Sequence, residues 1–467
     1  MASDPEQPAH SSFAKEARSG GEIGSAIEPL LNGVHDSESY SVSAAILPFL
    51  FPALGGLLFG YDIGATSSAT ISIQSPTLSG VSWYKLSSVE IGLLTSGSLY
   101  GALIGSLLAF NVADFLGRRK ELIGAAVVYL VGALVTALAP NFPVLVLGRL
   151  VFGIGIGLAG YGIGSLFVET VSGWRYMYGV SSPVAIIMGV GMWWLPASPR
   201  WLLLRAIQGK GDVQNSKDIA IRSLCQLRGQ AFYDSVPWQV DEILAELSYL
   251  GEEKEATFGE LFQGKCLKAL WIGSGLVLFQ QITGQPSVLY YAGSIFQSAG
   301  FSGASDATRV SILLGFFKLI MTGVAVVVVD KLGRRPLLLG GVSGIVISLF
   351  FLGSYYIFLD NSPVVAVIGL LLYVGSYQIS FGPIGWLMIA EIFPLRLRGR
   401  GLSIAVLVNF GANALVTFAF SPLKALLGAG ILFYTFCVIA VASLVFIYFV
   451  IPETKGLTLE EIEAKCL

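Results

Sequence analysis

The chain has 467 residues, of which 54% are hydrophobic and only 12% are Asp, Glu, Lys or Arg. Soluble domains carry about 25% charged residues, so this composition excludes a soluble enzyme as the first interpretation and favours a bundle of membrane helices. The formal net charge of −2 provides no basic surface for nucleic acid. The only histidines are His10 and His35, and the four cysteines form no CxxC pair. We therefore expect no histidine-based catalytic triad, no metal site and no disulfide framework.

The chain begins with a polar segment and continues with apolar stretches that are long enough to cross a ~30 Å hydrocarbon core. Residues 1–43 contain no apolar stretch, so we expect a disordered cytosolic tail there and no signal peptide. Eleven apolar stretches follow, at 44–64, 89–110, 121–140, 143–168, 176–195, 269–296, 308–329, 336–358, 363–389, 401–421 and 429–451. The pattern predicts an all-α polytopic membrane protein with about 11 apparent spans.

Two polar segments complete the predicted organisation. Segment 196–268 carries nine basic residues, so we place it in the cytosol, and its stretch Gln239–Leu250 has the spacing of an amphipathic helix at the membrane surface. Segment 452–467 is predicted to be a cytosolic tail.

The two halves of the chain repeat the same short motifs. The string Asp114-Phe-Leu-Gly-Arg-Arg119 follows the second span, and Asp330-Lys-Leu-Gly-Arg-Arg335 follows the second span of the later half. Pro196-Ala-Ser-Pro-Arg200 ends the first half and Pro452-Glu-Thr-Lys-Gly456 ends the second. This repeat predicts an N-terminal helical half at 44–195 and a C-terminal six-helix half at 269–451, as in many membrane transporters.

The first half is shorter than the second. Asp114 and Pro196 are 82 positions apart, whereas Asp330 and Pro452 are 122 apart. The difference of 40 positions corresponds to about two half-spans and a loop. The distribution of Lys and Arg also requires an even number of spans before the basic segment 196–268, but only five are present. We therefore interpret the Gly-rich stretch 143–168 as the start of one span joined to the end of another.

Seven motifs in order resemble those of the sugar porter family of the major facilitator superfamily, in particular its plant D-xylose/proton symporter-like members, which include vacuolar glucose transporters. The resemblance covers 44–467. It rests on Gly55-Gly-Leu-Leu-Phe-Gly-Tyr-Asp62, the paired Gly-Arg-Arg loops, Gln280-Gln281-Ile-Thr-Gly284, Tyr290-Tyr291, Gly382-Pro-Ile-Gly-Trp386, Glu391 to Arg400, and Pro452-Glu-Thr-Lys-Gly456.

The resemblance implies the major facilitator fold, with twelve spans in two six-helix halves that move monosaccharides by alternating access. Here Leu158-Ala159 continues directly into Gly160-Tyr161, so the end of span four, the following loop and the start of span five are predicted to be missing. Two interpretations follow: a proton-coupled hexose or pentose transporter, or a transport-inactive splice form of one that is unstable or acts only through the full-length protein. We expect no enzyme activity, no cofactor beyond the coupling proton, a monomer, and a vacuolar or other cell membrane.

Proton coupling is predicted at Asp62 in the first span, because a carboxylate at membrane depth is costly and is usually functional. The resemblance gives this Asp the proton and makes Arg149 its partner. A nearby guanidinium favours the ionised carboxylate, so protonation is coupled to the arrangement of the two helices. The alternative is a purely structural ion pair.

Sugar recognition requires amide groups for the hydroxyls and an aromatic face for the ring. The resemblance assigns this role to Gln280, Gln281, Trp386, Asn409 and Asn413. Hydrogen bonding between helices is the alternative for the glutamines, as packing is for the tryptophan.

Lys318 stands where many relatives carry Asn in the eighth span, and Pro286 replaces the Asn that follows the glutamine pair. Lys318 either hydrogen-bonds the sugar or extends its amine to the membrane surface.

A cytoplasmic charge network is predicted to hold the two halves together in the outward-open state. Topology alone accounts for its basic residues but not for the acids beside them. Its members are Asp114, Arg118, Arg119, Asp330, Arg334, Arg335, Glu391, Arg398 and Arg400. Because the corresponding Glu/Arg loop of the first half is missing, we expect this network to be asymmetric.

Overall fold

The computed structural model describes residues 42–155, 172–208, 212–228, 236–252, 258–300, 304–359, 363–393, 397–457 and 461–462. In these ranges the chain is helical and contains no strand, which confirms the predicted fold class. Nearly all of the predicted tail 1–43, the Gly-rich stretch after Gly155 and part of the C-terminal segment lie outside the described residues.

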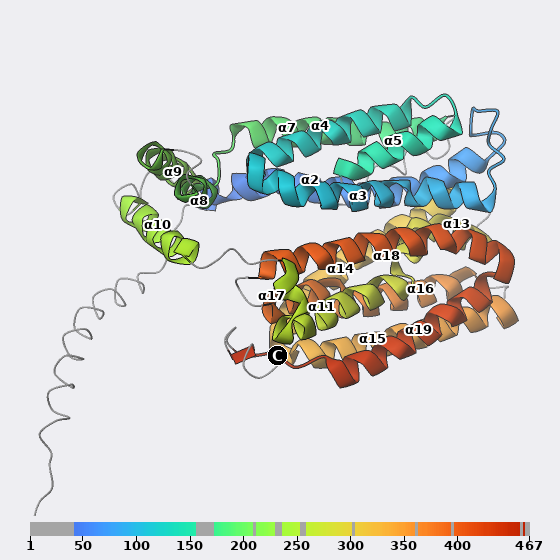
Figure 1. The fold of residues 1–467 in the computed structure, drawn as a ribbon. Helices are drawn as coiled ribbons and strands as arrows, with labels where there is room; N and C mark the ends of the chain where they lie inside the picture. The colour runs from blue at the N-terminus through green and yellow to red at the C-terminus, as the bar shows by residue number, and fades with distance from the viewer. Residues whose placement is uncertain are drawn as a thin grey trace, which may run out of the picture.

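The helices form two bundles that lie side by side (Figure 1). The first bundle contains α2 (Val42–Gln74), α3 (Ser88–Leu116), α4 (Arg118–Ala137), α5 (Phe142–Gly155), α6 (Gly173–Gly179) and α7 (Ser181–Trp194). The second contains α11 (Gly264–Ile282), α12 (Gln285–Tyr290), α13 (Ala292–Ser298), α14 (Ala304–Leu332), α15 (Arg334–Ser354), the π-helical turn η5 (Tyr355–Leu359), α16 (Pro363–Ile379), α17 (Phe381–Ile392), α18 (Arg398–Leu427) and α19 (Ala429–Val450). Eight stretches in the described ranges are long and apolar enough to cross a membrane.

A single glycine makes the same sharp turn in each bundle. Gly117 separates α3 from α4 with φ of 80°, and Gly333 separates α14 from α15 with φ of 95°. Residues with a Cβ rarely adopt this conformation, which explains why both Gly-Arg-Arg motifs begin with glycine. The repeated motif is therefore a repeated backbone turn at corresponding places in the two halves.

Two stretches that the sequence predicts as continuous spans are broken. Gly284, with φ of 95°, ends α11 and starts α12, and Pro286 occupies the first turn of α12. Ser380 separates α16 from α17 with φ of −105° and ψ of −91°. The first break places the glutamine pair at the end of α11, where side chains can reach the space between the bundles.

The described part of α5 comprises 14 residues, from Phe142 to Gly155, or about 21 Å at 1.5 Å per residue. Two glycines allow it to approach α3 very closely. A Cβ on Gly101 would stand 2.0 Å from the Leu150 carbonyl oxygen, and one on Gly153 would stand 1.9 Å from that of Ser98. After the undescribed stretch, the Ser172 amide donates to the Leu78 carbonyl oxygen in the loop between α2 and α3.

Three short helices lie beyond one end of the bundles, on the same side as the C-terminus (Figure 1). They are α8 (Pro199–Ile207), α9 (Val213–Arg228) and α10 (Val236–Glu252), and a 3₁₀ turn, η4 (Phe258–Phe262), precedes α11. Their own apolar core includes Leu203, Ala220 and Val240. Lys217 pairs with Asp241 at 2.5 Å across α9 and α10. Helix α10 includes the predicted amphipathic stretch.

We expect Gly153→Leu to prevent the close packing of α5 on α3. Overpacking usually costs about 1–3 kcal/mol, and here the clash is with backbone, which cannot rotate away. The melting temperature of the purified protein in detergent should fall well below that of the unsubstituted chain. Gly124→Ala is the matched control, because a Cβ on Gly124 meets nothing within 4 Å; equal melting of the two variants would contradict this packing.

Candidate functional site: a central cavity and a buried ion pair

The two bundles contact each other at the end that lies away from α8–α10. There the Thr95 and Tyr291 hydroxyls are 2.5 Å apart, and the Gly293 amide donates to Ser67 Oγ at 3.0 Å. A Cβ on Gly92 would stand only 2.6 Å from the Phe418 carbonyl oxygen, so α3 and α18 touch through their backbones. The bundles are thus joined at this end.

Between the bundles lies a cavity of about 1050 Å³ that extends toward the other end, where Lys120 and Glu121 line it. We call that other end the basic end, because both Gly-Arg-Arg turns lie there. Lys and Arg collect on the cytoplasmic side of membrane proteins, so the prediction that this end faces the cytosol applies to the cavity mouth as well. All six residues predicted to bind sugar line it: Gln280, Gln281, Lys318, Trp386, Asn409 and Asn413.

The glutamine amides donate hydrogen bonds that fix their orientation. Gln280 Nε2 donates to the Phe381 carbonyl oxygen at 2.7 Å, and Gln281 Nε2 donates to Asn409 Oδ1 at 2.6 Å. The Oε1 atoms of both glutamines, and that of Gln378, are buried and accept no hydrogen bond in the described structure. A buried acceptor without a donor costs about 1–3 kcal/mol. These oxygens are therefore suited to accept hydrogen bonds from a ligand.

The remaining cavity residues present varied chemistry. Trp386 and Lys318 are partly exposed and line the cavity, and both alternatives for Lys318 stay predictions. Asn413 Oδ1 accepts from the Thr417 hydroxyl at 3.3 Å. Gly382 allows α17 to approach Gln378, since a Cβ there would stand 3.0 Å from Nε2 of that glutamine.

Asp62 and Arg149 form an ion pair between α2 and α5, and each side chain is 1% exposed. Ser98 Oγ donates to Asp62 Oδ2 at 2.9 Å. The Arg149 guanidinium also donates to Ser98 Oγ at 3.0 Å and to the Leu94 carbonyl oxygen at 3.2 Å. Its Cζ lies 5.0 Å from the centre of the Tyr178 ring. Helix α5 thus carries the arginine that the sequence analysis paired with Asp62.

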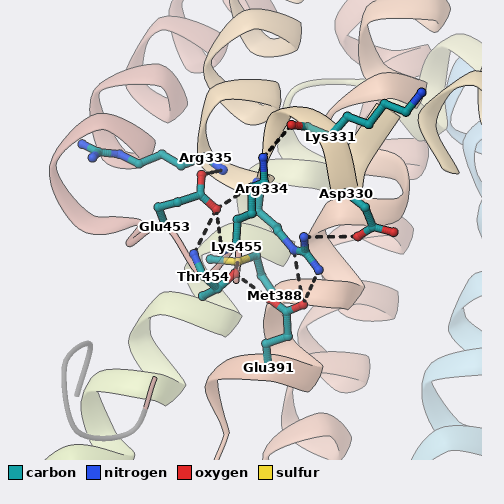
Figure 2. A network of polar contacts seen from close by, with 9 residues as sticks. All are labelled: Asp330, Lys331, Arg334, Arg335, Met388, Glu391, Glu453, Thr454 and Lys455. Atoms are coloured by element: carbon teal, nitrogen blue, oxygen red, sulfur yellow. Dashed lines mark hydrogen bonds and ion pairs between the residues drawn. The ribbon is translucent and has the colours of Figure 1, made fainter. Parts of the chain in front are cut away.

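At the basic end, several charged residues of the second half, including Arg334, Glu391 and Glu453, form one network (Figure 2). Arg334 bonds Glu391 at 2.9 Å and Asp330 at 3.2 Å. Glu453 accepts from the backbone amides of Arg334 and Arg335 at 3.1 and 3.0 Å. A carboxylate at these first amides of α15 satisfies donors that have no partner within the helix.

Arg119 of the first half bonds within its own bundle. Its guanidinium donates to the carbonyl oxygens of Met192 and Trp193. In the second half, Arg398 donates to the Phe393 carbonyl oxygen at 3.4 Å, and Arg400 is partly exposed. The side chains of Asp114 and Arg118 lie outside the described residues. The predicted charge network between the two halves is therefore still a prediction, and it concerns the outward-open state.

Sequence reasoning missed several residues of this site. Ser98 and Tyr178 surround the ion pair, but no spacing connects them to Asp62. Gln378 is detectable in principle, because it is an amide inside an apolar span. Glu453 belongs to a motif that the sequence analysis quoted without a role.

Comparison with known proteins identifies the family. The family model described as "Sugar (and other) transporter" matches residues 49–170 and 158–465. "D-xylose-proton symporter-like 2" of Arabidopsis thaliana is 69% identical, with all of both chains covered, and "D-xylose-proton symporter-like 3, chloroplastic" of the same plant is 58% identical over 97% of this chain and 88% of that protein. The chain belongs to the sugar transporter family of the major facilitator superfamily and is a multi-pass membrane protein, which confirms the predicted resemblance.

Solved structures agree with this assignment. The proton:xylose symporter XylE bound to 6-bromo-6-deoxy-D-glucose is 29% identical, with a TM-score of 0.70 over 91% of this chain and 99% of that one. The inward open conformation of XylE from E. coli is 27% identical, also with a TM-score of 0.70, over 89% of this chain and 98% of that one.

The comparisons also support the predicted gap. The alignment with the 69% identical relative has 503 positions, which leaves about 36 at which this 467-residue chain has no residue. The two family-model matches meet at 158–170, where the sequence places the junction.

We expect Arg149→Gln to destabilise the protein strongly. It leaves the buried Asp62 carboxylate without its counter-ion, and breaking a buried pair by removing one partner costs about 3–5 kcal/mol. Thermal unfolding in detergent would measure the loss. Lys217→Gln breaks an ion pair whose side chains are 25% and 52% exposed, and should cost less than about 1 kcal/mol. Similar melting temperatures for the two variants would contradict the predicted difference.

We expect Glu453→Ala to loosen the start of α15, because two backbone amides lose their acceptor. Loss of a helix cap costs about 0.5–2 kcal/mol. Limited trypsin digestion should then cleave faster after Arg334; the bond after Arg335 is resistant because Pro336 follows it. Asp330→Ala serves as the control, because the Asp330 side chain is 78% exposed and contacts only the Arg334 side chain in this network. An unchanged cleavage rate for the Glu453 variant would show that the cap contributes little.

Proposed function

We propose that this chain carries a monosaccharide, a hexose or a pentose, across a membrane by alternating access and couples the movement to a proton. The observation that carries this proposal is the buried Asp62–Arg149 pair beside the central cavity. A charged pair at membrane depth is costly to maintain and is usually functional. Phe59, three positions before Asp62 on α2, and the adjacent Ile63 line the cavity.

The cavity chemistry supports a sugar as the cargo. Gln280, Gln281 and Gln378 offer buried oxygens that sugar hydroxyls can satisfy, and the amide of Asn409 is already held in place by Gln281. The partly exposed Trp386 provides an aromatic face for the CH surface of a ring. Small-molecule sites combine such apolar walls with a few fixed polar groups, and their volumes reach about 1,000 Å³.

The ion pair supplies a physical means of coupling. When Asp62 is ionised, it holds Arg149 and so joins α2 to α5. When Asp62 takes up a proton, this attraction is lost, while Arg149 keeps its bonds to Ser98 and the Leu94 carbonyl and its position over Tyr178. Protonation thus removes the attraction between α2 and α5, while the guanidinium keeps its other hydrogen bonds. The relative arrangement of the two helices can therefore change when Asp62 is protonated.

The present arrangement represents the inward-facing state. To reach the outward-facing state, the Thr95–Tyr291 and Ser67–Gly293 contacts separate and the basic ends approach each other. Arg119 and the network around Glu391 and Arg334 would then lie between the halves and hold them together. Because the first half lacks its Glu/Arg loop, this closure has fewer partners than in a complete chain.

A transport-inactive form is the second candidate, favoured by the roughly 36 missing positions. In that case the chain would be unstable or would act only through a full-length protein. For either form we retain a vacuolar membrane, a monomer, no catalytic activity and no cofactor beyond the proton as proposals.

Uptake of labelled glucose and xylose in yeast without its own hexose carriers tests the proposal. We expect uptake that rises with an inward proton gradient. Asp62→Asn imitates a permanently neutral carboxyl, so this variant should lose the response to the gradient. Thr435→Ala is the matched control: this exposed hydroxyl donates only to the Ile431 carbonyl of its own helix, so transport should be unchanged.

The same assay separates the two candidates. A chain with the missing segment restored is measured in parallel, and the membrane abundance of every variant is determined. Uptake by the unsubstituted chain excludes the inactive form. Uptake by the restored chain alone, at equal abundance, excludes transport by this one.

A further inference from the structure

The second arginine of each Gly-Arg-Arg motif makes the same contact in the two halves. The Arg335 guanidinium donates to the Tyr448 carbonyl oxygen near the end of α19 at 2.7 Å. The Arg119 guanidinium donates to the Met192 carbonyl oxygen near the end of α7 at 3.2 Å. Each acceptor lies four positions before the proline that opens the closing motif of its half. The two halves therefore match residue by residue at this place.

This match puts Ala197 of the first half where Glu453 stands in the second. Glu453 accepts from the backbone amides of Arg334 and Arg335 (Figure 2). Its carboxylate lies so close to the turn that a Cβ on Gly333 would stand 2.8 Å from Oε2. The first amides of a helix have no partner within the helix and favour an anion. Ala197 has no side-chain acceptor, so the first half repeats the turn without the carboxylate.

A cavity of about 250 Å³ lies at the turn of the first half, and we call it the α4 turn cavity. Gly117, Arg119 and Lys120 line it from the start of α4, and Ala197 and Ser198 line it from the segment before α8. Two basic side chains, a hydroxyl and the positive end of a helix thus border one space. This combination suits an anion with several oxygens, because different oxygens can accept from different donors at the same time.

Three tryptophans indicate where this cavity lies. A Cβ on Gly117 would stand 2.8 Å from Cε2 of Trp201, so that ring lies against the turn, but an indole accepts no hydrogen bond from an amide. Trp193 also lines the cavity and is 66% exposed, and its neighbour Trp194 is 82% exposed. Exposed tryptophans at the ends of membrane helices lie at the level of the lipid headgroups. The α4 turn cavity therefore lies at the membrane surface.

We propose that the α4 turn cavity binds a phosphate group, which serves α4 as the Glu453 carboxylate serves α15. Phosphate oxygens accept from the amides at a helix N-terminus and pair with Lys and Arg side chains. The phosphate has two available sources, the headgroup of a phospholipid and free inorganic phosphate. The exposed tryptophans beside the cavity favour the phospholipid. The proposal concerns binding and does not depend on transport activity.

Titration of the purified protein in a non-ionic detergent tests this proposal. Dioctanoyl phosphatidic acid and inorganic phosphate are added in separate experiments, and dioctanoylglycerol, which lacks the phosphate, is the blank. We expect a saturable rise in melting temperature with phosphatidic acid and none with the blank, because a ligand that binds the folded state stabilises it. A rise with phosphatidic acid alone identifies the headgroup as the source, and an equal rise with inorganic phosphate identifies free phosphate. No saturable rise with either would overturn the proposal.

A pair of matched lysine variants locates the site. Lys120→Gln should weaken the apparent affinity for phosphatidic acid about fivefold, which is the usual contribution of one basic side chain near an anionic lipid. Lys331→Gln removes the same charge beside the other Gly-Arg-Arg turn, whose amides already bind Glu453, and should leave the affinity unchanged. Equal weakening by both variants, or by neither, would overturn the proposal, since the lipid would then not be held at the α4 turn cavity.

Ala197→Glu supplies the first half with the carboxylate that the second half carries. We expect this variant to melt at a higher temperature than the unsubstituted chain without ligand and to lose the rise with phosphatidic acid, because the glutamate occupies the amides of α4. A folded Ala197→Glu protein that still binds phosphatidic acid with unchanged affinity would contradict the proposed place of the phosphate. If this variant does not fold, the two lysine variants decide the question by themselves.

Discussion

The need to keep a buried charge paired determines how the first half is assembled. Asp62 and Arg149 are almost completely buried, and each would be costly without the other. Their pairing requires α2, α3 and α5 to meet at one point, because Ser98 and the Leu94 carbonyl of α3 complete the shell of the guanidinium. Glycine makes this approach possible: a Cβ on Gly97 would stand 3.0 Å from the Arg149 Cβ. The close packing of α5 on α3 and the position of the cavity wall depend on the same contact.

The interruption of the chain falls just beyond this contact. Arg149 lies in α5, six residues before Gly155, the last described residue of this helix, and the helix keeps both the charge partner of Arg149 and its packing on α3. The described part of the chain thus retains the proposed coupling pair, and all six proposed sugar-binding residues line the central cavity.

The side chains of Gln280 and Gln281 are also buried and polar, but unlike the ion pair they are only partly hydrogen-bonded. The amide nitrogens of Gln280 and Gln281 are satisfied by Phe381 and Asn409, whereas their oxygens are left without donors. The break at Gly284 is what brings these side chains to the cavity. Here a buried polar group is kept incompletely bonded, so a ligand can supply the missing donor.

The sequence by itself determined the class of protein, the two-fold repeat and the interruption near residue 158. These conclusions rest on hydropathy, on the positions of basic residues and on the order of motifs, all of which can be read along the sequence without any tertiary contact. It also predicted roles for Asp62 and the glutamines, since polar groups inside apolar stretches are evident from the sequence alone. Only the tertiary structure decided that Arg149 still reaches Asp62, that Ser98 and Tyr178 surround the pair, and that Glu453 caps α15. These contacts join helices that are far apart in the sequence. They depend on how the helices pack against each other, and the residue pattern within one helix contains no information about that packing.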